Sequence, residues 1–211
     1  MATEGIGVSG YGHWGLVIFN ALLWIGVTSV LIRPRALREK YAFSLLALFL
    51  ADEYIELMGF PFTISLLSDK FTSYPTAEFL SRRAGDLWRI LLHQEDTGGG
   101  LDLYHLVGGV FIFGGLVLLF FASRVLQHTQ ASGLPATMGP YAWVRHPQYL
   151  ALILMMLGFV IQGPTLLTLL LFPVLGYLYV RLARSEEREV LAKYGQAYAA
   201  YMKRTPSFIR W

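Results

Sequence analysis

Five long apolar stretches constrain the fold of this chain more than any other feature. They occupy residues 14–32, 41–67, 103–123, 149–162 and 165–183. A helix that crosses a bilayer needs about 20 apolar residues, and the first, third and fifth stretches reach that length. The fourth is too short to cross alone, so we expect it to form a hairpin with the fifth through a tight turn at Gln162-Gly163-Pro164.

The overall composition agrees with a chain that lies in a membrane. Hydrophobic residues make up 55% of the sequence and charged residues only 15%, whereas soluble domains carry about a quarter charged residues. We therefore predict one all-α domain over residues 1–211, an integral membrane bundle of about five transmembrane helices. N-terminal helices and an external loop would fill 1–138, and a cytoplasmic helix would end the region 139–211. The chain has no cysteine, which excludes disulfides and a cysteine nucleophile.

Basic residues concentrate in three segments. Four lie in 33–40, two in 124–148 and seven after residue 180, so 13 of the 17 lysines and arginines would face one side. By the positive-inside rule that side is the cytoplasm. We expect a bacterial inner membrane protein with its N-terminus outside, its C-terminus in the cytoplasm and segment 68–102 as an external loop. The net charge of +3 then reflects topology in the lipid bilayer, and we expect no nucleic acid partner.

A polar cluster, GPYAWVRHPQYL at residues 139–150, precedes the fourth stretch. Pro147 is compatible with the first turn of a helix, which places Arg145 and His146 at a helix N-terminus, where exposed N–H groups attract anions. Arg145 would grip a carboxylate or phosphate with two donors, and a neutral His146 would donate one hydrogen bond and accept another. The alternative is that Arg145 is only a membrane-interface anchor and His146 a loop residue with satisfied hydrogen bonds.

Glu187 begins a stripe on a helix that we expect to continue beyond the fifth stretch. The stripe repeats at helical offsets and comprises Glu187, Leu191, Tyr194, Tyr198 and Tyr201. Because this face should turn inward, the carboxylate of Glu187 needs a cation or hydrogen-bond donors, and tyrosine rings attract cations. Together with the basic cluster, the stripe suits a ligand that carries both a positive centre and a carboxylate. Glu189, next to Arg188 and four residues before Lys193, indicates a solvated face instead.

Three acids interrupt the second apolar stretch: Asp52, Glu53 and Glu56. Intramembrane acids are functional candidates by default, and Asp52 shares a helix face with Glu56. Three interpretations remain open: a buried polar network, direct contact with a substrate, and a place at the outer membrane interface. The acids are too close together, and too far from any histidine, to indicate a metal site.

Gly108 and Gly115 lie seven residues apart in the third stretch and therefore share one helix face. Small residues on such a face let a neighbouring helix approach closely. We expect a helix packing contact at these two glycines.

Several motifs of the C-terminal third follow one another in order: Gly139-Pro140-Tyr141, Arg145-His146-Pro147-x-Tyr149, an apolar helical hairpin, Glu186-Glu187, and Tyr194-Gly195-x-x-Tyr198-x-x-Tyr201. By these motifs residues 139–211 resemble the isoprenylcysteine carboxyl methyltransferase family, and related phospholipid and small-thiol methyltransferases are similar over the same span. Residues 1–138 are similar only in containing membrane helices. The sequence departs from the family pattern at Ala151, where glycine is frequent, and at Pro206-Ser207-Phe208-Ile209, where family members have a proline-terminated loop.

The resemblance implies an enzyme that uses S-adenosylmethionine, bound by the loop before the hairpin and the helix after it. The cofactor-binding residues would be Tyr141, Arg145, His146, Tyr149, Glu186, Glu187 and Tyr198. Glu187 would also take part in catalysis by orienting the acceptor or accepting its proton. Arg204 is similar to a tail arginine that family members place near the acceptor, and we assign it a catalytic role as well.

The leading functional interpretation is a membrane methyltransferase with a lipophilic or small apolar acceptor, such as a prenylcysteine carboxylate, a phospholipid amine or a thiol. One alternative is an NADPH-dependent sterol-type reductase, which shares a similar C-terminal pattern but usually has more than five transmembrane helices. The other is a non-enzymatic proton-linked transporter or sensor built on Asp52, Glu53 and Glu56. The short chain and the lack of two similar halves argue against a transporter.

Overall fold

The computed structural model describes residues 18, 22, 37–54, 103–131 and 133–208. Our expectations for Glu56, for the loop 68–102 and, except at residues 18 and 22, for the stretch 14–32 lie outside the described residues. Within the described part, all regular structure is helical, in agreement with the predicted fold class. The elements are α2 (Leu37–Tyr54), α6 (Leu103–Ala131), the 3-10 helix η2 (Gly139–Ala142), α7 (Pro147–Gln162), α8 (Leu166–Tyr194) and α9 (Gln196–Arg204).

Two of these helices, α6 and α8, are long and apolar enough to cross a membrane. The candidate spans are Leu103–Thr129 and Leu167–Tyr194, and only 28% and 22% of their most apolar windows are buried. A core helix of a soluble protein would bury most of such a window. Here large apolar side chains such as Phe113 and Leu170 are exposed, as expected for helices that face lipid. In the described part of the chain, these two helices therefore support the prediction that this is a membrane protein.

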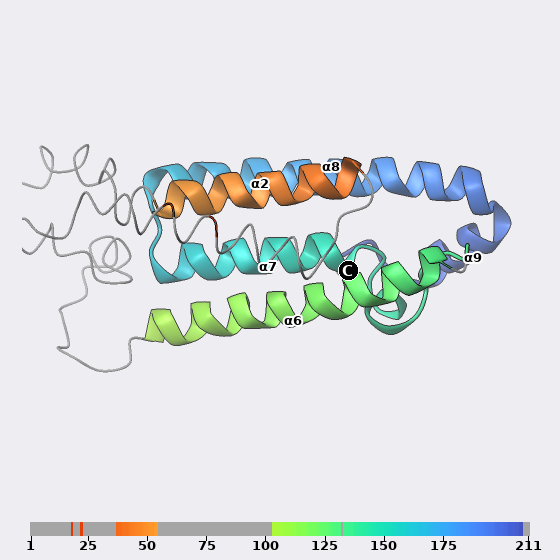
Figure 1. Ribbon diagram of the computed structural model, residues 1–211, viewed down its shortest axis with the longest axis horizontal. Helices are drawn as coiled ribbons and strands as arrows, with labels where there is room; N and C mark the ends of the chain where they lie inside the picture. Colours follow the sequence, from red (N-terminus) through yellow and green to blue (C-terminus); the bar gives the residue numbers. More distant parts are fainter. Residues whose placement is uncertain (1–17, 19–21, 23–36, 55–102, 132, 209–211) are drawn as a thin grey trace, which may run out of the picture.

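Helix α7 is the centre of the bundle, with α6 on one side and α2 and α8 on the other (Figure 1). Its 16 residues cover about 24 Å, which is less than the roughly 30 Å of a hydrocarbon core. Its inward positions hold Ala151, Leu152, Met155, Met156, Gly158 and Val160, all of which are buried. These apolar side chains of α7 are kept from water because the longer helices α2, α6 and α8 pack around it.

The turn between α7 and α8 confirms the predicted hairpin. Gly163 and Pro164 separate the two helices, and Thr165 caps the start of α8. The Thr168 amide donates to the Thr165 hydroxyl (3.0 Å), while the Thr165 amide donates to the Thr168 hydroxyl (2.8 Å). This reciprocal capping satisfies two backbone donors that a helix start would otherwise leave open.

The glycines of α6 permit the close contact with α7 that the sequence predicts. A Cβ atom at Gly115 would lie 2.8 Å from the Ala151 carbonyl oxygen, and one at Gly158 would lie 2.6 Å from the Gly108 carbonyl oxygen. A Cβ atom at Gly108 would also collide with Gln162. Backbone therefore packs on backbone along this interface, as small residues allow in membrane helices.

The predicted continuous helix from the fifth stretch through Tyr201 is wrong. Helix α8 ends at Tyr194, and Gly195 adopts φ 57° and ψ −131°, a conformation that side-chain-bearing residues rarely reach. The chain reverses there, so α9 folds back from the far end of α8 towards the end of α6 (Figure 1). The third stretch differs too, because α6 continues past Ser123 to Ala131.

The α6–α7 contact leads to a stability prediction for two adjacent glycines of α6. We expect Gly115→Ala to destabilise the protein by about 1–3 kcal/mol, because the new methyl group would overpack the interface. Gly114→Ala is the matched control, since a Cβ at Gly114 meets nothing within 4 Å and alanine favours the helix. Thermal unfolding in detergent measures both variants, and equal melting temperatures would contradict the packing argument.

Candidate functional site

The site forms where the start of α7 meets the segment after α9. His146 is the N-cap of α7 and Pro147 its first residue, as the sequence predicts. The backbone amide of Arg145 donates to the Pro206 carbonyl (2.8 Å), and that of His146 donates to the Ser207 carbonyl (3.1 Å). The chain beyond α9 is thereby held along the two residues that precede α7.

Most of the guanidinium group of Arg145 forms hydrogen bonds with other residues of this chain. Its Nε donates to Glu187 Oε1 (2.8 Å), and its Nη1 donates to the carbonyls of Met202 (2.8 Å) and Thr205 (3.1 Å). Its Nη2 donates to the Ser207 hydroxyl. Four of the five N–H donors of the side chain are engaged in this way. From the sequence we expected these donors to bind an anionic ligand. The sequence did not reveal the two main-chain carbonyls that accept from Arg145, because a carbonyl belongs to every residue type.

Glu187 receives the cationic partner that the sequence predicts for a carboxylate on an inward face. One oxygen, Oε1, accepts from Arg145 Nε, from the Ser207 hydroxyl (3.0 Å) and from His146 Nε2 (2.9 Å). The side chain is only 13% exposed. We call the group of Arg145, His146, Glu187 and Ser207 the clasp, because it joins α7, α8 and the segment after α9.

His146 is buried between two carboxylates. Its Nε2 faces Glu187, and its Nδ1 lies 3.6 Å from Glu186 Oε2. Burial alone would lower the pKa of His146, but hydrogen bonds and charge attraction from Glu186 and Glu187 outweigh it and raise the pKa above 6.5. The two carboxylates therefore favour protonation of the imidazole more than water does, whereas the sequence analysis assumed the neutral form.

Aromatic rings hold His146 in place. Tyr149 stacks on it with ring centroids 5.8 Å apart, and Phe208 lies against it at the same separation. Tyr149 in turn stacks on Tyr179 of α8 at 6.0 Å. Tyr149 therefore supports the imidazole from within the core.

The fold-back at Gly195 brings two tyrosines of α9 to the site. The Tyr201 hydroxyl donates to the Tyr141 carbonyl (2.5 Å), which ties α9 to η2. Tyr198 is buried beside Tyr201, with ring centroids 5.5 Å apart. Burial raises the pKa of Tyr198 to about 12, and the charges of Glu187 and Glu186 act in the same direction. Tyr198 thus presents a neutral hydroxyl at physiological pH.

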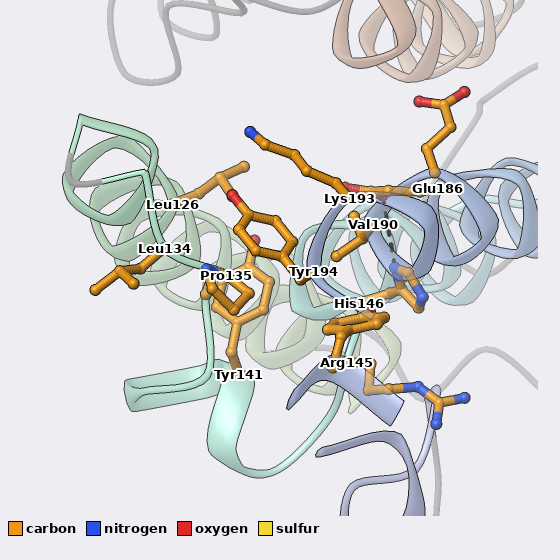
Figure 2. Close-up of a pocket in the computed structure, with 13 residues that line it drawn as sticks. Leu126, Leu134, Pro135, Tyr141, Arg145, His146, Glu186, Val190, Lys193 and Tyr194 are labelled. Atoms are coloured by element: carbon orange, nitrogen blue, oxygen red, sulfur yellow. Dashed lines mark ion pairs between the residues drawn. The ribbon is translucent and has the colours of Figure 1, made fainter. Parts of the chain in front are cut away.

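A cavity of about 240 Å³ lies beside the clasp. It is lined by Leu126, Leu134, Pro135, Ala136, Tyr141, Arg145, His146, Glu186, Glu189, Val190, Lys193, Tyr194 and Tyr198. The rings of Tyr141 and Tyr194 lie close to Pro135 on one side and His146 lies on the other, while the guanidinium of Arg145 points away from the tyrosines (Figure 2). Ligand pockets usually enclose roughly 300–1,000 Å³, so this cavity is somewhat smaller than a typical ligand pocket.

The structure gathers most of the residues that the sequence singled out for a cofactor. Tyr141, Arg145, His146, Glu186 and Tyr198 line the cavity. Glu187 and Tyr149 lie behind His146 and contact its ring. Arg204 is exposed at the end of α9 and does not line the cavity. The roles of these residues in cofactor binding and catalysis remain predictions.

Asp52 and Glu53 lie far from this cavity. Both are buried in α2, and a Cβ at Gly163 would lie 3.6 Å from Glu53 Oε1. Glu53 is therefore next to the α7–α8 turn, at the opposite end of α7 from His146. This position separates the described acids from a ligand in the cavity.

Several cavity residues were not predicted from the sequence. Leu126 belongs to the end of α6 that we did not predict, and Leu134, Pro135 and Ala136 belong to the following loop. Glu189 and Lys193 are exposed, as their spacing predicts, and they also line the cavity. The available signal was Tyr194 in the aromatic stripe, because Val190 lies about one turn before it and Lys193 directly precedes it.

The clasp predicts that a single hydroxyl stabilises the fold. Ser207 donates to Glu187 and accepts from Arg145, so Ser207→Ala should cost about 1–3 kcal/mol by removing one hydrogen bond from each of two part-buried charged groups. Ser44→Ala is the control, because the Ser44 hydroxyl is exposed and bonds to the Lys40 carbonyl of its own helix. Unchanged unfolding of the Ser207 variant would contradict the importance of the clasp.

The raised pKa of His146 predicts a pH dependence of stability. The folded state binds the proton more tightly than the unfolded state, so this contribution is complete below pH 6.5 and is lost as pH rises through the folded pKa. We expect the melting temperature difference between the wild type and His146→Gln to shrink over that interval. The exposed His128, changed to Gln, serves as the control, and a difference that grows with pH would reverse the assigned protonation.

Comparison with known proteins gives one match. No curated protein and no solved structure matches the chain. Residues 114–192 match the model of the Isoprenylcysteine carboxyl methyltransferase (ICMT) family. The matched stretch includes Arg145, His146 and the glutamate pair, and it ends before Tyr198 and the segment after α9. The resemblance indicated by the motifs is thereby confirmed: residues 114–192 are a match to the isoprenylcysteine carboxyl methyltransferase family, a family of membrane methyltransferases.

Proposed function

We propose that this protein is an S-adenosylmethionine-dependent membrane methyltransferase that acts on a lipophilic or small apolar acceptor. The observation that carries the proposal is the cavity beside the clasp, which combines carboxylates, an imidazole and tyrosine rings. Tyr141, His146 and Glu186 of its lining lie in the stretch that matches a methyltransferase family, and Tyr194 and Tyr198 directly follow that stretch. This combination of charges and rings suits a ligand with a positive centre, a carboxylate and a flat base.

The chemistry of the lining residues fits S-adenosylmethionine. When bound, the cofactor supplies an electrophilic methyl group on a sulfonium cation. Glu186 and Glu189 provide negative charge at the cavity, and Tyr141, Tyr194 and Tyr198 provide ring faces that attract cations. The side chain of Glu186 is 35% exposed, so it is better placed than Glu187 to face a ligand cation.

The clasp supports an orienting role for Glu187 in this proposal. Its Oε1 atom already accepts from three donors, one of them a guanidinium. Such contacts stabilise the carboxylate and make it a weak base. Glu187 therefore serves to hold His146 and Arg145 in place, and holding reactants in register can account for several kcal/mol of barrier lowering.

An apolar acceptor agrees with the surroundings of the cavity. Leu126, Leu134 and Val190 form an apolar part of its wall, and α6 and α8 expose apolar side chains of the kind that face lipid. A prenylcysteine carboxylate, a phospholipid amine or a thiol on a lipophilic carrier would match this environment. We assign Arg204, exposed on α9, to contact with the acceptor's polar group.

Charge supports a cytoplasmic position for the site. Exposed basic side chains gather at the cavity end of the molecule, among them Arg181, Arg184, Lys193 and Lys203. Basic residues favour the cytoplasmic side of an inner membrane. The cavity would thus open to the compartment in which the cofactor is made, while the acceptor approaches through the bilayer.

Ligand-induced thermal stabilisation tests the proposal. S-adenosylmethionine and S-adenosylhomocysteine at about 100 times their Kd should raise the melting temperature of the detergent-solubilised protein by roughly 5–10 °C. Glu186→Gln should reduce this shift, and Arg188→Gln, which alters an exposed neighbour outside the cavity, should not. Labelled methyl transfer into lipid and thiol extracts would then identify the acceptor class. Stabilisation by NADPH instead would point to a reductase and refute the proposal.

A further inference from the structure

Three basic side chains line the cavity in the described part of the chain: Arg145, His146 and Lys193. A ligand that carries a carboxylate needs a cation among them, because burying an unpaired carboxylate is costly. The structure distinguishes the three by what each already contacts.

Arg145 has little left to offer a ligand. Four of its N–H groups donate to Glu187, Met202, Thr205 and Ser207. Its guanidinium also points away from the tyrosine rings of the cavity (Figure 2). Turning it towards a ligand would break the clasp and remove the guanidinium from Glu187.

His146 is committed as well. Its two ring nitrogens face Glu187 and Glu186, and its side chain is only 4% exposed. In the protonated state that the site favours, both N–H groups already point at carboxylates. A ligand carboxylate placed here would meet two negative side chains.

Lys193 differs from both. It lies in the last turn of α8, and its ammonium is 5.0 Å from the centroid of the Tyr194 ring. The side chain is exposed and reaches over that ring at the edge of the cavity (Figure 2). An ammonium on a flexible four-carbon chain carries three donors that rotate freely, and the attraction of a ring face at an exposed site is weak enough to yield to a carboxylate.

The spacing along α8 also fits. Glu186 and Lys193 are seven residues apart, so they share one face of the helix and their backbones are separated by about 10 Å along its axis. Tyr194 lines the same cavity next to Lys193. One helix face thus presents a negative group and a positive group to opposite parts of the same ligand.

We infer that Lys193, and not Arg145, supplies the cationic contact for the carboxylate of the methyl donor, with the sulfonium side of the ligand directed towards Glu186. The inference rests on the proposed function and adds a binding residue to it. Arg145 then has a positioning role, because it holds Glu187 and the segment after α9 in place.

Isothermal titration in detergent tests the inference with two ligands that differ in one group. The first is S-adenosylhomocysteine, and the second is its decarboxylated analogue, which keeps the amino group and the nucleoside. Lys193→Gln should weaken S-adenosylhomocysteine by about tenfold, the effect of losing one charge-assisted hydrogen bond, and should leave the analogue unchanged. Lys193→Arg should restore most of the affinity. Lys203→Gln, which removes the same charge from an exposed site on α9 outside the cavity, should change neither ligand.

The outcomes separate this inference from the proposed function. If the wild type binds S-adenosylhomocysteine and Lys193→Gln binds it equally well, the lysine assignment is overturned and the cofactor proposal stands. An equal loss for both ligands also overturns the carboxylate contact, because Lys193 would then act through the shape of the cavity. Failure of the wild type to bind S-adenosylhomocysteine would overturn the proposed function and this inference together.

Discussion

One carboxylate oxygen organises the functional end of this protein. Glu187 Oε1 accepts hydrogen bonds from an arginine, a histidine and a serine that come from the start of α7 and from the segment after α9. A part-buried negative charge is tolerated only when such donors surround it. The orientation of His146 and the path of the segment after α9 follow from this requirement, and His146 lines the cavity.

The site divides its charged residues between holding the architecture and facing a ligand. Arg145 and Glu187 form an ion pair in which both side chains are largely buried, and Arg145 also lines the cavity. Glu186 and Lys193 lie at the cavity with a larger share of their side chains exposed. Such a division keeps the strongest ion pair independent of the ligand, so the shape of the site is set before anything binds.

Local signals predicted some parts of the site, while longer-range contacts decided the rest. Pro147 marked the start of α7, and the hairpin turn and the glycine face of α6 were likewise readable from short patterns. From the helical spacing we predicted that the helix bearing the aromatic stripe continues through Gly195. It ends before that residue, and a glycine is common directly after the end of a helix. The acceptors of Arg145 are carbonyls of Met202 and Thr205. Any residue type supplies such a group, so no sequence pattern reveals it.

The fold-back after α8 has a consequence for the order in which this protein is built. The residues that complete the clasp follow every described membrane helix along the chain, and Ser207 pairs with His146, which is 61 positions earlier. During synthesis α7 and α8 are therefore made before Ser207, the clasp residue that lies after α9. The membrane helices would therefore be inserted while the cavity is still incomplete, and the cavity would reach its final shape only when α9 and the segment after it dock.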